Sequence, residues 1–314
     1  MSDGAQVQVS VVVPAHDAAA TLPATLAALE AQEIEAPFEV IVVDDGSKDR
    51  TAQLAERAGV RVVRNRRPLG PGAARNAGVA ASTGSALAFT DADCVPTRGW
   101  LAAGVEALAT AGLVQGRVEP PPGVRVGPFD RTLWVTGPVG LFESANLFVR
   151  REVFESLGGF DDGLLDVAGA HFGEDISFGW RARRAGVATG FCDRALVHHA
   201  VFERGPGEYL HERRRLAYFC EMARRVPELR GSFFYRRWFL SRRTAIFACA
   251  TAGLLASALS RRPALALAAV PYARLANADR RGVGAGAAAV VVVGDAVGLA
   301  ALVRGSLRFR TLVL

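Results

Sequence analysis

The sequence predicts an α/β fold, with a parallel sheet covered by helices on both faces and a separate helical C-terminal region. Two observations support this prediction. In the N-terminal third of the chain, four short apolar runs rich in β-branched residues alternate with segments of helical periodicity. Such alternation is typical of parallel sheets. The apolar content then rises sharply after about Thr244, which indicates a second region in a different environment.

The first predicted strand, 8–13, is an apolar run closed by Pro14, as expected of a buried strand. The next segment, 21–31, has helical spacing, with Thr21 as a cap and Pro23 in the first turn. The same criteria give further elements in alternation. Strands are predicted at 38–43, 60–63 and 86–90, and helices at 48–58 and 72–81.

Beyond residue 112 the pattern becomes less regular. Three consecutive prolines at 120–122 mark a loop. Past this loop, a strand is predicted at 147–149 and helices at 151–157, 174–185 and 205–225.

The C-terminal region contains apolar segments at 244–260, 263–277 and 283–303. The last is long enough to span a bilayer, with Asp295 as its only charge. Pairs of arginines flank these segments, which favours membrane helices over the alternative, a small helical subdomain that packs on the first domain. The predicted domains are an α/β domain at 1–203, a basic helical segment at a membrane surface at 204–243, and an apolar helical membrane region at 244–314.

The charge distribution points to the same environment. The chain has a net charge of +6, and eleven arginines lie between Arg204 and Arg243, directly before the apolar segments. We therefore expect this stretch to meet a membrane surface, and no motif supports nucleic-acid binding. The four cysteines form no C-x-x-C pair, which predicts neither a zinc site nor a disulfide framework. Since the N-terminus has no signal segment, the first domain is expected in the cytoplasm.

Acidic residues follow two of the predicted strands. Asp44 and Asp45 end the second strand, and Asp91 and Asp93 end the fourth. Ligands of open α/β sheets bind at the carboxyl ends of the strands, and Mg²⁺ prefers carboxylates together with substrate phosphates. A metal-binding pair is one interpretation of the Asp-x-Asp motif, and a solvated turn is the other.

Two common nucleotide-binding classes are excluded by their motifs. A dinucleotide-binding fold needs Gly-x-Gly-x-x-Gly after its first strand, whereas the turn at 14–17 contains no glycine. The chain also has no P-loop motif.

Five motifs in order give the acidic residues a context. They are Val-Ser-Val-Val-Val-Pro at 9–14, Val-Val-Asp-Asp-Gly-Ser-x-Asp at 42–49, Ala-Ala-Arg-Asn-x-Gly at 73–78, Phe-Thr-Asp-Ala-Asp at 89–93, and Gly-Glu-Asp followed by an arginine at 173–181. This series closely resembles the family 2 glycosyltransferases of GT-A fold. The resemblance covers roughly residues 8 to 200 and does not extend to the C-terminal region.

The resemblance implies a nucleotide-sugar-binding, Rossmann-like sheet with a divalent cation, Mg²⁺ or Mn²⁺. It implies a general base at Asp175, with Glu174 beside it. Both residues begin a predicted helix, whose positive end is expected to keep the carboxylate ionised. The implied donor-binding residues are Pro14, Ala15, Asp44, Asp45, Arg75 and Asp91, and the implied metal ligands are Asp91, Asp93 and His199. For His199, a strand histidine with a satisfied hydrogen bond is the other interpretation. Which of the aspartates at 44 and 45 contacts the uracil or ribose is left open.

The implied activity is inverting transfer of one sugar from a nucleotide-diphosphate sugar to the hydroxyl of a glycan or lipid-linked acceptor, for cell-envelope glycan or glycolipid synthesis. The Gln-x-x-Arg-Trp motif of processive synthases is absent, so transfer of a single sugar is expected. Two alternatives are a polyprenyl-phosphate glycosyltransferase and a non-catalytic nucleotide-sugar-binding scaffold. The expected location is the cell membrane, with the catalytic domain on the cytoplasmic side.

Overall fold

A computed structural model describes residues 8–161, 164–165 and 171–314. By its internal contacts the chain divides into two compact units. Unit 1 comprises the residues up to Arg125 together with Thr132–Val201, and unit 2 comprises Val126–Arg131 and Phe202–Leu314.

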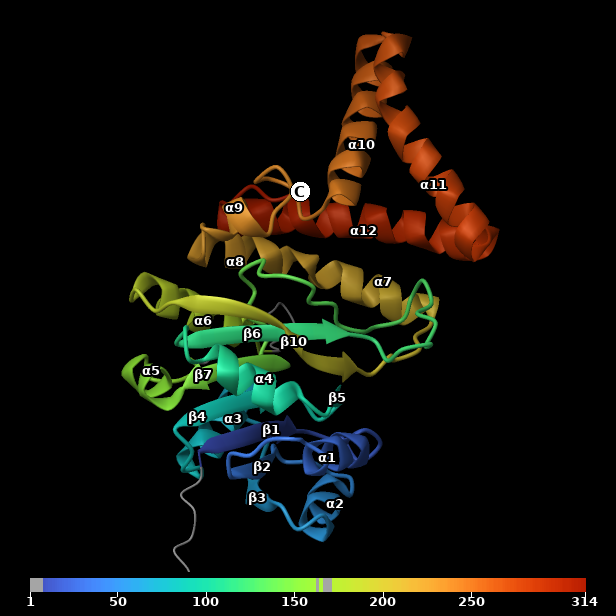
Figure 1. Cartoon of the computed structure of the whole chain (residues 1–314). Helices are drawn as coiled ribbons and strands as arrows, with labels where there is room; N and C mark the ends of the chain where they lie inside the picture. Colours follow the sequence, from blue (N-terminus) through green and yellow to red (C-terminus); the bar gives the residue numbers. More distant parts are fainter. Residues whose placement is uncertain (1–7, 162–163, 166–170) are drawn as a thin grey trace, which may run out of the picture. The chain divides into compact units, whose positions relative to one another are not determined.

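The first four strands of unit 1 follow the prediction closely (Figure 1). They are parallel, and the register places Val9 beside both Phe38 and Ala86. The runs of β1, β2 and β4 form central strands because both of their faces are largely buried, whereas the shorter β3 lies at the edge of the sheet. These strands are β1 (Val9–Ala15), β2 (Phe38–Asp44), β3 (Arg61–Arg64) and β4 (Ala86–Thr90).

The complete sheet is mixed, so the prediction of a parallel sheet is wrong for its second half. Its order is β3-β2-β1-β4-β7-β6-β10-β5. Strand β7 is antiparallel to both of its neighbours, and β5 is antiparallel to β10. After β6 the chain reaches β7 through a loop without a helix, whereas a parallel return requires a crossover connection. The additional strands are β5 (Cys94–Pro96), β6 (Leu113–Glu119), β7 (Asn146–Arg150) and β10 (Thr189–His199), with a separate pair β8 (Leu164–Leu165) and β9 (His171–Phe172).

The helices of unit 1 agree with the predicted segments to within three residues at each end, except for one unpredicted helix, α4. Helix α2 begins later than expected because Asp49 accepts hydrogen bonds from the backbone and hydroxyl of Thr51, which closes a turn before the helix. The helices are α1 (Leu22–Glu30), α2 (Thr51–Arg57), α3 (Pro71–Ala80), α4 (Trp100–Ala107), α5 (Arg151–Ser156) and α6 (Glu174–Arg184).

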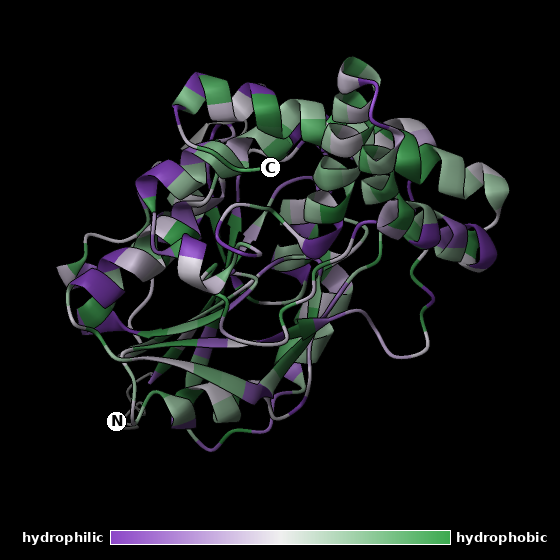
Figure 2. Ribbon diagram, turned by 90° about the horizontal axis from the view of Figure 1, so that it is seen from above, coloured by the Kyte–Doolittle hydropathy of each residue, from purple (hydrophilic) through white to green (hydrophobic). Residues whose placement is uncertain are grey.

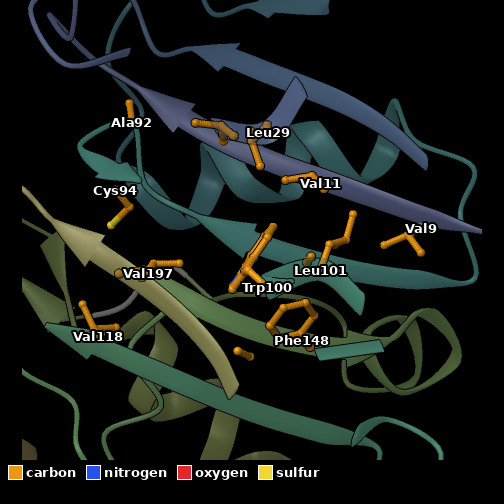
Figure 3. Packing of buried hydrophobic residues seen from close by; sticks show 14 of the residues in the cluster. Val9, Val11, Leu29, Ala92, Cys94, Trp100, Leu101, Val118, Phe148 and Val197 are labelled. Carbon is orange, nitrogen blue, oxygen red and sulfur yellow. The ribbon is translucent and has the colours of Figure 1, made fainter. Parts of the chain in front are cut away.

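Side chains alternate along β1, so its valines face two helical layers. Val9, Val11 and Val13 are buried in one cluster with Leu29 of α1 and Trp100 of α4, and Figure 3 shows Val9, Val11, Leu29 and Trp100 among the side chains of this cluster. This cluster is the main hydrophobic core of unit 1.

The opposite face of the sheet packs on α3, α5 and α6. A Cβ atom added to Gly78 of α3 would lie 2.4 Å from Cγ1 of Val12, so only glycine allows the helix to approach this closely. Phe89 of β4 contacts the rings of Phe154 and Phe160, with centroids 5.7 and 5.2 Å away. The prediction of helices on both faces is therefore confirmed.

Unit 2 is helical. The predicted helix at 205–225 is divided by a 3₁₀ turn into two helices. The second apolar segment begins as a 3₁₀ helix, and Pro263 at its start cannot continue α10. The elements are α7 (Pro206–Arg214), η1 (Arg215–Ala217), α8 (Tyr218–Arg225), α9 (Leu229–Ser232), α10 (Arg242–Ser260), η2 (Pro263–Ala269), α11 (Val270–Val283) and α12 (Ala285–Phe309).

Two of these helices, α10 and α12, are long and apolar enough to cross a membrane by length and composition. Figure 2 shows apolar residues along the C-terminal helices. The segment at 263–277, the middle one of the three predicted apolar segments, is divided between η2 and α11.

Candidate functional site

Arg75 lies at the centre of an acidic site in unit 1. It is carried by α3 and is 4% exposed. Its guanidinium donates to Asp91 at 2.7 Å and to Glu174 at 3.0 Å. The guanidinium thus joins the end of β4 to the start of α6, two segments that are more than 80 residues apart in the sequence.

Asp175, the predicted base, follows a sharp turn. Gly173 adopts a left-handed conformation with φ of 72°, which suits glycine and lets α6 begin immediately afterwards. The carboxylate of Asp175 accepts hydrogen bonds from the backbone N–H of Ser144 at 3.2 Å and from that of Ile176 at 2.8 Å. These two donors fix the direction of the carboxylate.

Burial raises the pKa of Asp175 to about 8, and the negative charges of Glu174 and Glu143 contribute in the same direction. The positive charge of Arg75 opposes this shift but does not cancel it. The prediction that the helix terminus keeps Asp175 ionised is therefore wrong at neutral pH, because desolvation outweighs the helix dipole.

Glu143 is a member of this site that sequence reasoning missed. It lies in the loop before β7, next to Ser144, and Gln115 of β6 donates a hydrogen bond to its carboxylate. Burial raises the pKa of Glu143 as well. No signal in the motifs indicated this residue, because its neighbourhood depends on β7 and β6 lying side by side.

Asp93 and His199 are brought together by an unpredicted strand pairing. Strand β5 pairs with the end of β10, and His199 lies opposite Cys94. Nε2 of His199 lies 3.6 Å from Oδ2 of Asp93. Nδ1 of His199 lies 2.7 Å from the carbonyl of Ala200, which can only accept a hydrogen bond. In a neutral imidazole this contact leaves Nε2 without the proton, so that Nε2 is the nitrogen with a free lone pair.

The predicted metal ligands do not form one compact cluster. Asp91 turns to Arg75, whereas Asp93 turns to His199. Across the described ranges, no group of three or more His, Cys, Asp and Glu side chains has a metal-binding arrangement. An imidazole nitrogen and a carboxylate oxygen 3.6 Å apart still fit a cation that completes its coordination with substrate phosphates and water.

The paired aspartates after β2 have different surroundings. The carboxylate of Asp45 accepts hydrogen bonds from the backbone N–H groups of Leu69 and Gly70 and from the side chain of Asn65. Asp44 accepts a hydrogen bond from the backbone N–H of Ser47 at 3.0 Å. Asp45 therefore shapes the loop before α3, and Asp44 closes the turn after β2.

The predicted donor-binding residues Pro14 and Ala15 lie beside these aspartates. In the pairing of β1 with β2, Pro14 lies opposite Val43 and Ala15 opposite Asp44. The carbonyl of Ala15 also accepts the backbone N–H of Asp45 at 2.8 Å. The ends of β1 and β2 thus form one continuous edge.

Two residues of the sequence motifs, Asn76 and Arg181, bind the backbone at 157–160. The side-chain amide of Asn76 exchanges two hydrogen bonds with the backbone of Phe160, at 2.7 and 3.0 Å. Arg181 donates to the carbonyl groups of Leu157 and Gly159. These contacts hold the segment at 157–160 against α3 and α6, which explains both motif positions structurally.

Family models match both parts of the chain. The model described as glycosyl transferase family 2 matches residues 10–157, and that described as glycosyl transferase family group 2 matches residues 129–278. The second match extends the similarity beyond the motifs into unit 2.

Individual proteins give the same result. The chain is 31% identical to glycosyltransferase AglE of Haloferax volcanii over 66% of its own length and 71% of the relative. A shorter stretch is 44% identical to an undecaprenyl-phosphate 4-deoxy-4-formamido-L-arabinose transferase of Pseudomonas aeruginosa, but it covers only 27% of each chain.

The fold is also similar to that of a solved structure, mannosyltransferase PcManGT from Pyrobaculum calidifontis in complex with GDP-mannose and Mn²⁺. The TM-score is 0.65 at 22% identity, and the alignment covers 95% of this chain and 86% of the other. At this identity the comparison establishes the fold. Together with the archaeal relative and the family matches, it shows that the chain is a glycosyltransferase that belongs to family 2 and has the GT-A fold.

Proposed function

We propose that the enzyme transfers a single sugar from a nucleotide-diphosphate sugar to an acceptor hydroxyl, with inversion at the anomeric carbon and a bound divalent cation. The observation that carries this proposal is the joining of Asp91, Arg75 and Glu174 beside Asp175. This arrangement brings the motif expected to bind the donor next to the motif expected to activate the acceptor.

Asp175 is the proposed general base. A direct displacement with inversion requires a group that removes the proton from the acceptor hydroxyl as the new bond forms. A carboxylate with a pKa of about 8 is a stronger base than an ordinary aspartate and is close to the optimum for proton transfer near neutral pH. The two backbone N–H donors orient it toward the acceptor.

Asp93 and His199 are the proposed protein ligands of Mg²⁺ or Mn²⁺. Bound there, the cation would neutralise negative charge on the departing nucleotide diphosphate. Arg75 keeps the neighbouring Asp91 in place through their ion pair. Asp91 is then available as a further ligand only when the donor or the cation draws it from the guanidinium.

The edge formed by β1 and β2 is the proposed nucleotide-binding side. The carboxylate of Asp45 is already used by the three donors of the loop before α3. Asp44 uses one oxygen for its turn. We therefore assign the contact with the base or ribose to Asp44 and the shaping of the pocket to Asp45, with Pro14 and Ala15 beside them.

A polyprenyl phosphate is the alternative acceptor. It is suggested by the similarity to the undecaprenyl-phosphate transferase. A phosphate oxygen is already ionised at neutral pH and needs no base. The raised pKa of Asp175 favours the hydroxyl acceptor, because a positioned base has no task in the alternative.

The C-terminal region is proposed to hold the enzyme at the cell membrane, with unit 1 on the cytoplasmic side where nucleotide sugars are made. Full-length protein should then sediment with membranes and require detergent for its release. Release by salt alone would indicate surface attachment.

The function can be tested in two stages. A thermal-shift panel of nucleotide sugars with Mn²⁺ or Mg²⁺ identifies the donor, since ligand that binds the native state raises its stability. Transfer is then measured with wild type and Asp175→Asn on hydroxyl and polyprenyl-phosphate acceptors. Loss of transfer to the hydroxyl acceptor supports the proposal, whereas near-normal turnover of the variant supports the phosphate acceptor.

A further inference from the structure

Helix α10 and the η2–α11 segment form a hairpin within unit 2 (Figure 1). The two arms approach closely at Gly253. A Cβ atom there would lie 2.5 Å from Cβ of Ala268 and 2.7 Å from the carbonyl oxygen of Leu265. The turn between the arms contains Arg261, with φ of 56°, and Arg262.

The hairpin carries large apolar side chains that no other part of unit 2 covers. No charged residue occurs between Thr244 and Ser260. In the other arm, the only charged residue between the tip and Asp279 is Arg274, which is exposed. It lies five residues from Asp279, about 8 Å along the helix, from where an arginine can extend its guanidinium to the interface. Leaving apolar surface in water is unfavourable by about 25 cal/mol per Å² of apolar area. The most exposed large apolar side chains of the hairpin are Leu254 (51%), Leu255 (59%), Leu259 (86%), Leu265 (41%), Leu267 (68%), Val270 (40%) and Val283 (41%).

The base of the hairpin is closed by a polar cluster. Nε of Arg243 donates to both carboxylate oxygens of Asp295, at 2.9 and 2.8 Å. Another nitrogen of the same guanidinium lies 2.9 Å from Asp279, and the hydroxyl of Tyr272 donates to Asp295 at 2.7 Å. The cluster joins α10, α11 and α12 through side chains of each helix.

The two arms match each other and a bilayer in length. From Arg243 to the tip, α10 rises about 27 Å at 1.5 Å per residue. From the tip to Asp279, the 3₁₀ and α-helical rises give about 29 Å. The hydrocarbon core of a bilayer is about 30 Å thick. Arginines stand at both ends, with Arg242 at the base and Arg261 and Arg262 at the tip, where they can meet lipid phosphates.

Helix α12 has a different environment, although it is the more apolar of the two candidate spans. Its glycines pack on α7, η1 and α8: a Cβ atom on Gly294 would lie 2.5 Å from the Tyr209 ring, and one on Gly305 would lie 2.7 Å from the carbonyl of Ala217. Helices α7 and α8 with η1 carry five arginines, at 213–215 and 224–225. Charged side chains are expelled from the hydrocarbon core. Helix α12 therefore cannot cross the bilayer while it packs on these arginine-bearing helices.

The C-terminus lies at the base of the hairpin. The carbonyl of Leu314 accepts the backbone N–H of Leu240 at 2.7 Å and the hydroxyl of Thr244 at 3.1 Å. The N–H of Leu314 donates to the carbonyl of Trp238 at 2.8 Å. Trp238 is 46% exposed, and tryptophan is enriched at membrane–water interfaces.

We propose that the chain crosses the bilayer twice, through the α10–α11 hairpin alone, while α12 lies in the plane of the interface. The tip at 261–262 then reaches the far headgroups. The C-terminus remains on the same side as unit 1, since the helices between residues 202 and 241 are at most nine residues long, too short to cross a bilayer. This inference rests on the membrane association proposed above.

Cysteine labelling tests this topology, because the only exposed cysteine is Cys249 and the other three are buried. In a Cys249→Ser background of the full chain, single cysteines replace Arg261 at the tip, Arg281 at the base and Arg308 near the end of α12. Inner-membrane vesicles with the cytoplasmic face outward are treated with a membrane-impermeant maleimide. We expect Arg281→Cys and Arg308→Cys to be labelled directly, and Arg261→Cys only after permeabilisation. Intact spheroplasts should give the reverse pattern.

Each other outcome overturns part of the proposal. Direct labelling of all three positions in the vesicles would show that the hairpin does not cross. Labelling of Arg281→Cys and Arg308→Cys from opposite sides would show that α12 does cross. Sugar transfer by the same variants is measured separately, since none of these positions is in the catalytic site. A failed transfer assay would therefore count against the proposed function, and a wrong labelling pattern against the topology.

Discussion

Replacement of Asp175 by asparagine should remove activity and at the same time stabilise the protein. The pKa of Asp175 is about 8 in the folded protein, against 3.8 for an ordinary aspartate. Between these values the folded state holds a proton that the unfolded chain releases. The free energy of unfolding therefore falls as the pH rises from about 4 to 8, by about 1.4 kcal/mol per pH unit. Asparagine cannot ionise, so the free energy of unfolding of the variant does not fall in this way as the pH rises.

The expected result is a difference in melting temperature that grows with pH. The two proteins should melt at similar temperatures near pH 4, and the variant should become progressively more stable than wild type up to about pH 8. Intrinsic fluorescence is a suitable probe, because Trp100, Trp134 and Trp180 lie in unit 1 and only Trp238 lies in unit 2. Turnover with a hydroxyl acceptor should fall about 10²- to 10⁴-fold, the usual effect of losing a positioned base.

Asp193→Asn is a matched control. Asp193 lies on β10 and its side chain is 70% exposed, so its substitution should change neither turnover nor the pH dependence of melting. If Asp175→Asn and wild type melt in parallel from pH 5 to 8, the burial argument is wrong. If donor affinity, measured by calorimetry, is lost together with turnover, Asp175 belongs to the donor site and is not the base.

Three further predictions concern the same site. The value of kcat/KM, which reports the free enzyme, should rise with pH and level off above about 8. Glu143→Gln removes a negative charge beside Asp175 and should therefore move the midpoint of this pH profile to lower pH. An unchanged profile would contradict an electrostatic interaction between Glu143 and Asp175. Chelation should abolish transfer, and Asp93→Ala should weaken cation-supported donor binding in calorimetry; full activity in excess chelator would exclude a metal requirement. Arg75→Met leaves the buried Glu174 without its partner and should destabilise the protein by about 3 kcal/mol, seen as a lower melting temperature, which Glu174→Gln in the same chain should partly restore.

The sequence was sufficient for the first half of the sheet and for the position of its acidic residues. Runs such as 9–13 can be buried on both faces only as central strands, and the helices between them impose parallel connections. Asp44 and Asp91 therefore had to lie at the same edge of the sheet. The five ordered motifs between residues 9 and 181 then identified the family, which the comparisons confirmed.

The remaining features depend on contacts between residues that are distant in the sequence. The antiparallel entry of β7 places Glu143 beside Asp175, and the pairing of β5 with β10 places His199 beside Asp93. The pKa of Asp175 could not be inferred from its place at a helix terminus, because that local effect is weaker than burial by the surrounding fold. Local pattern determined which residues carry the chemistry, and tertiary packing decided their partners and their protonation, because desolvation and charge act through space and not along the chain.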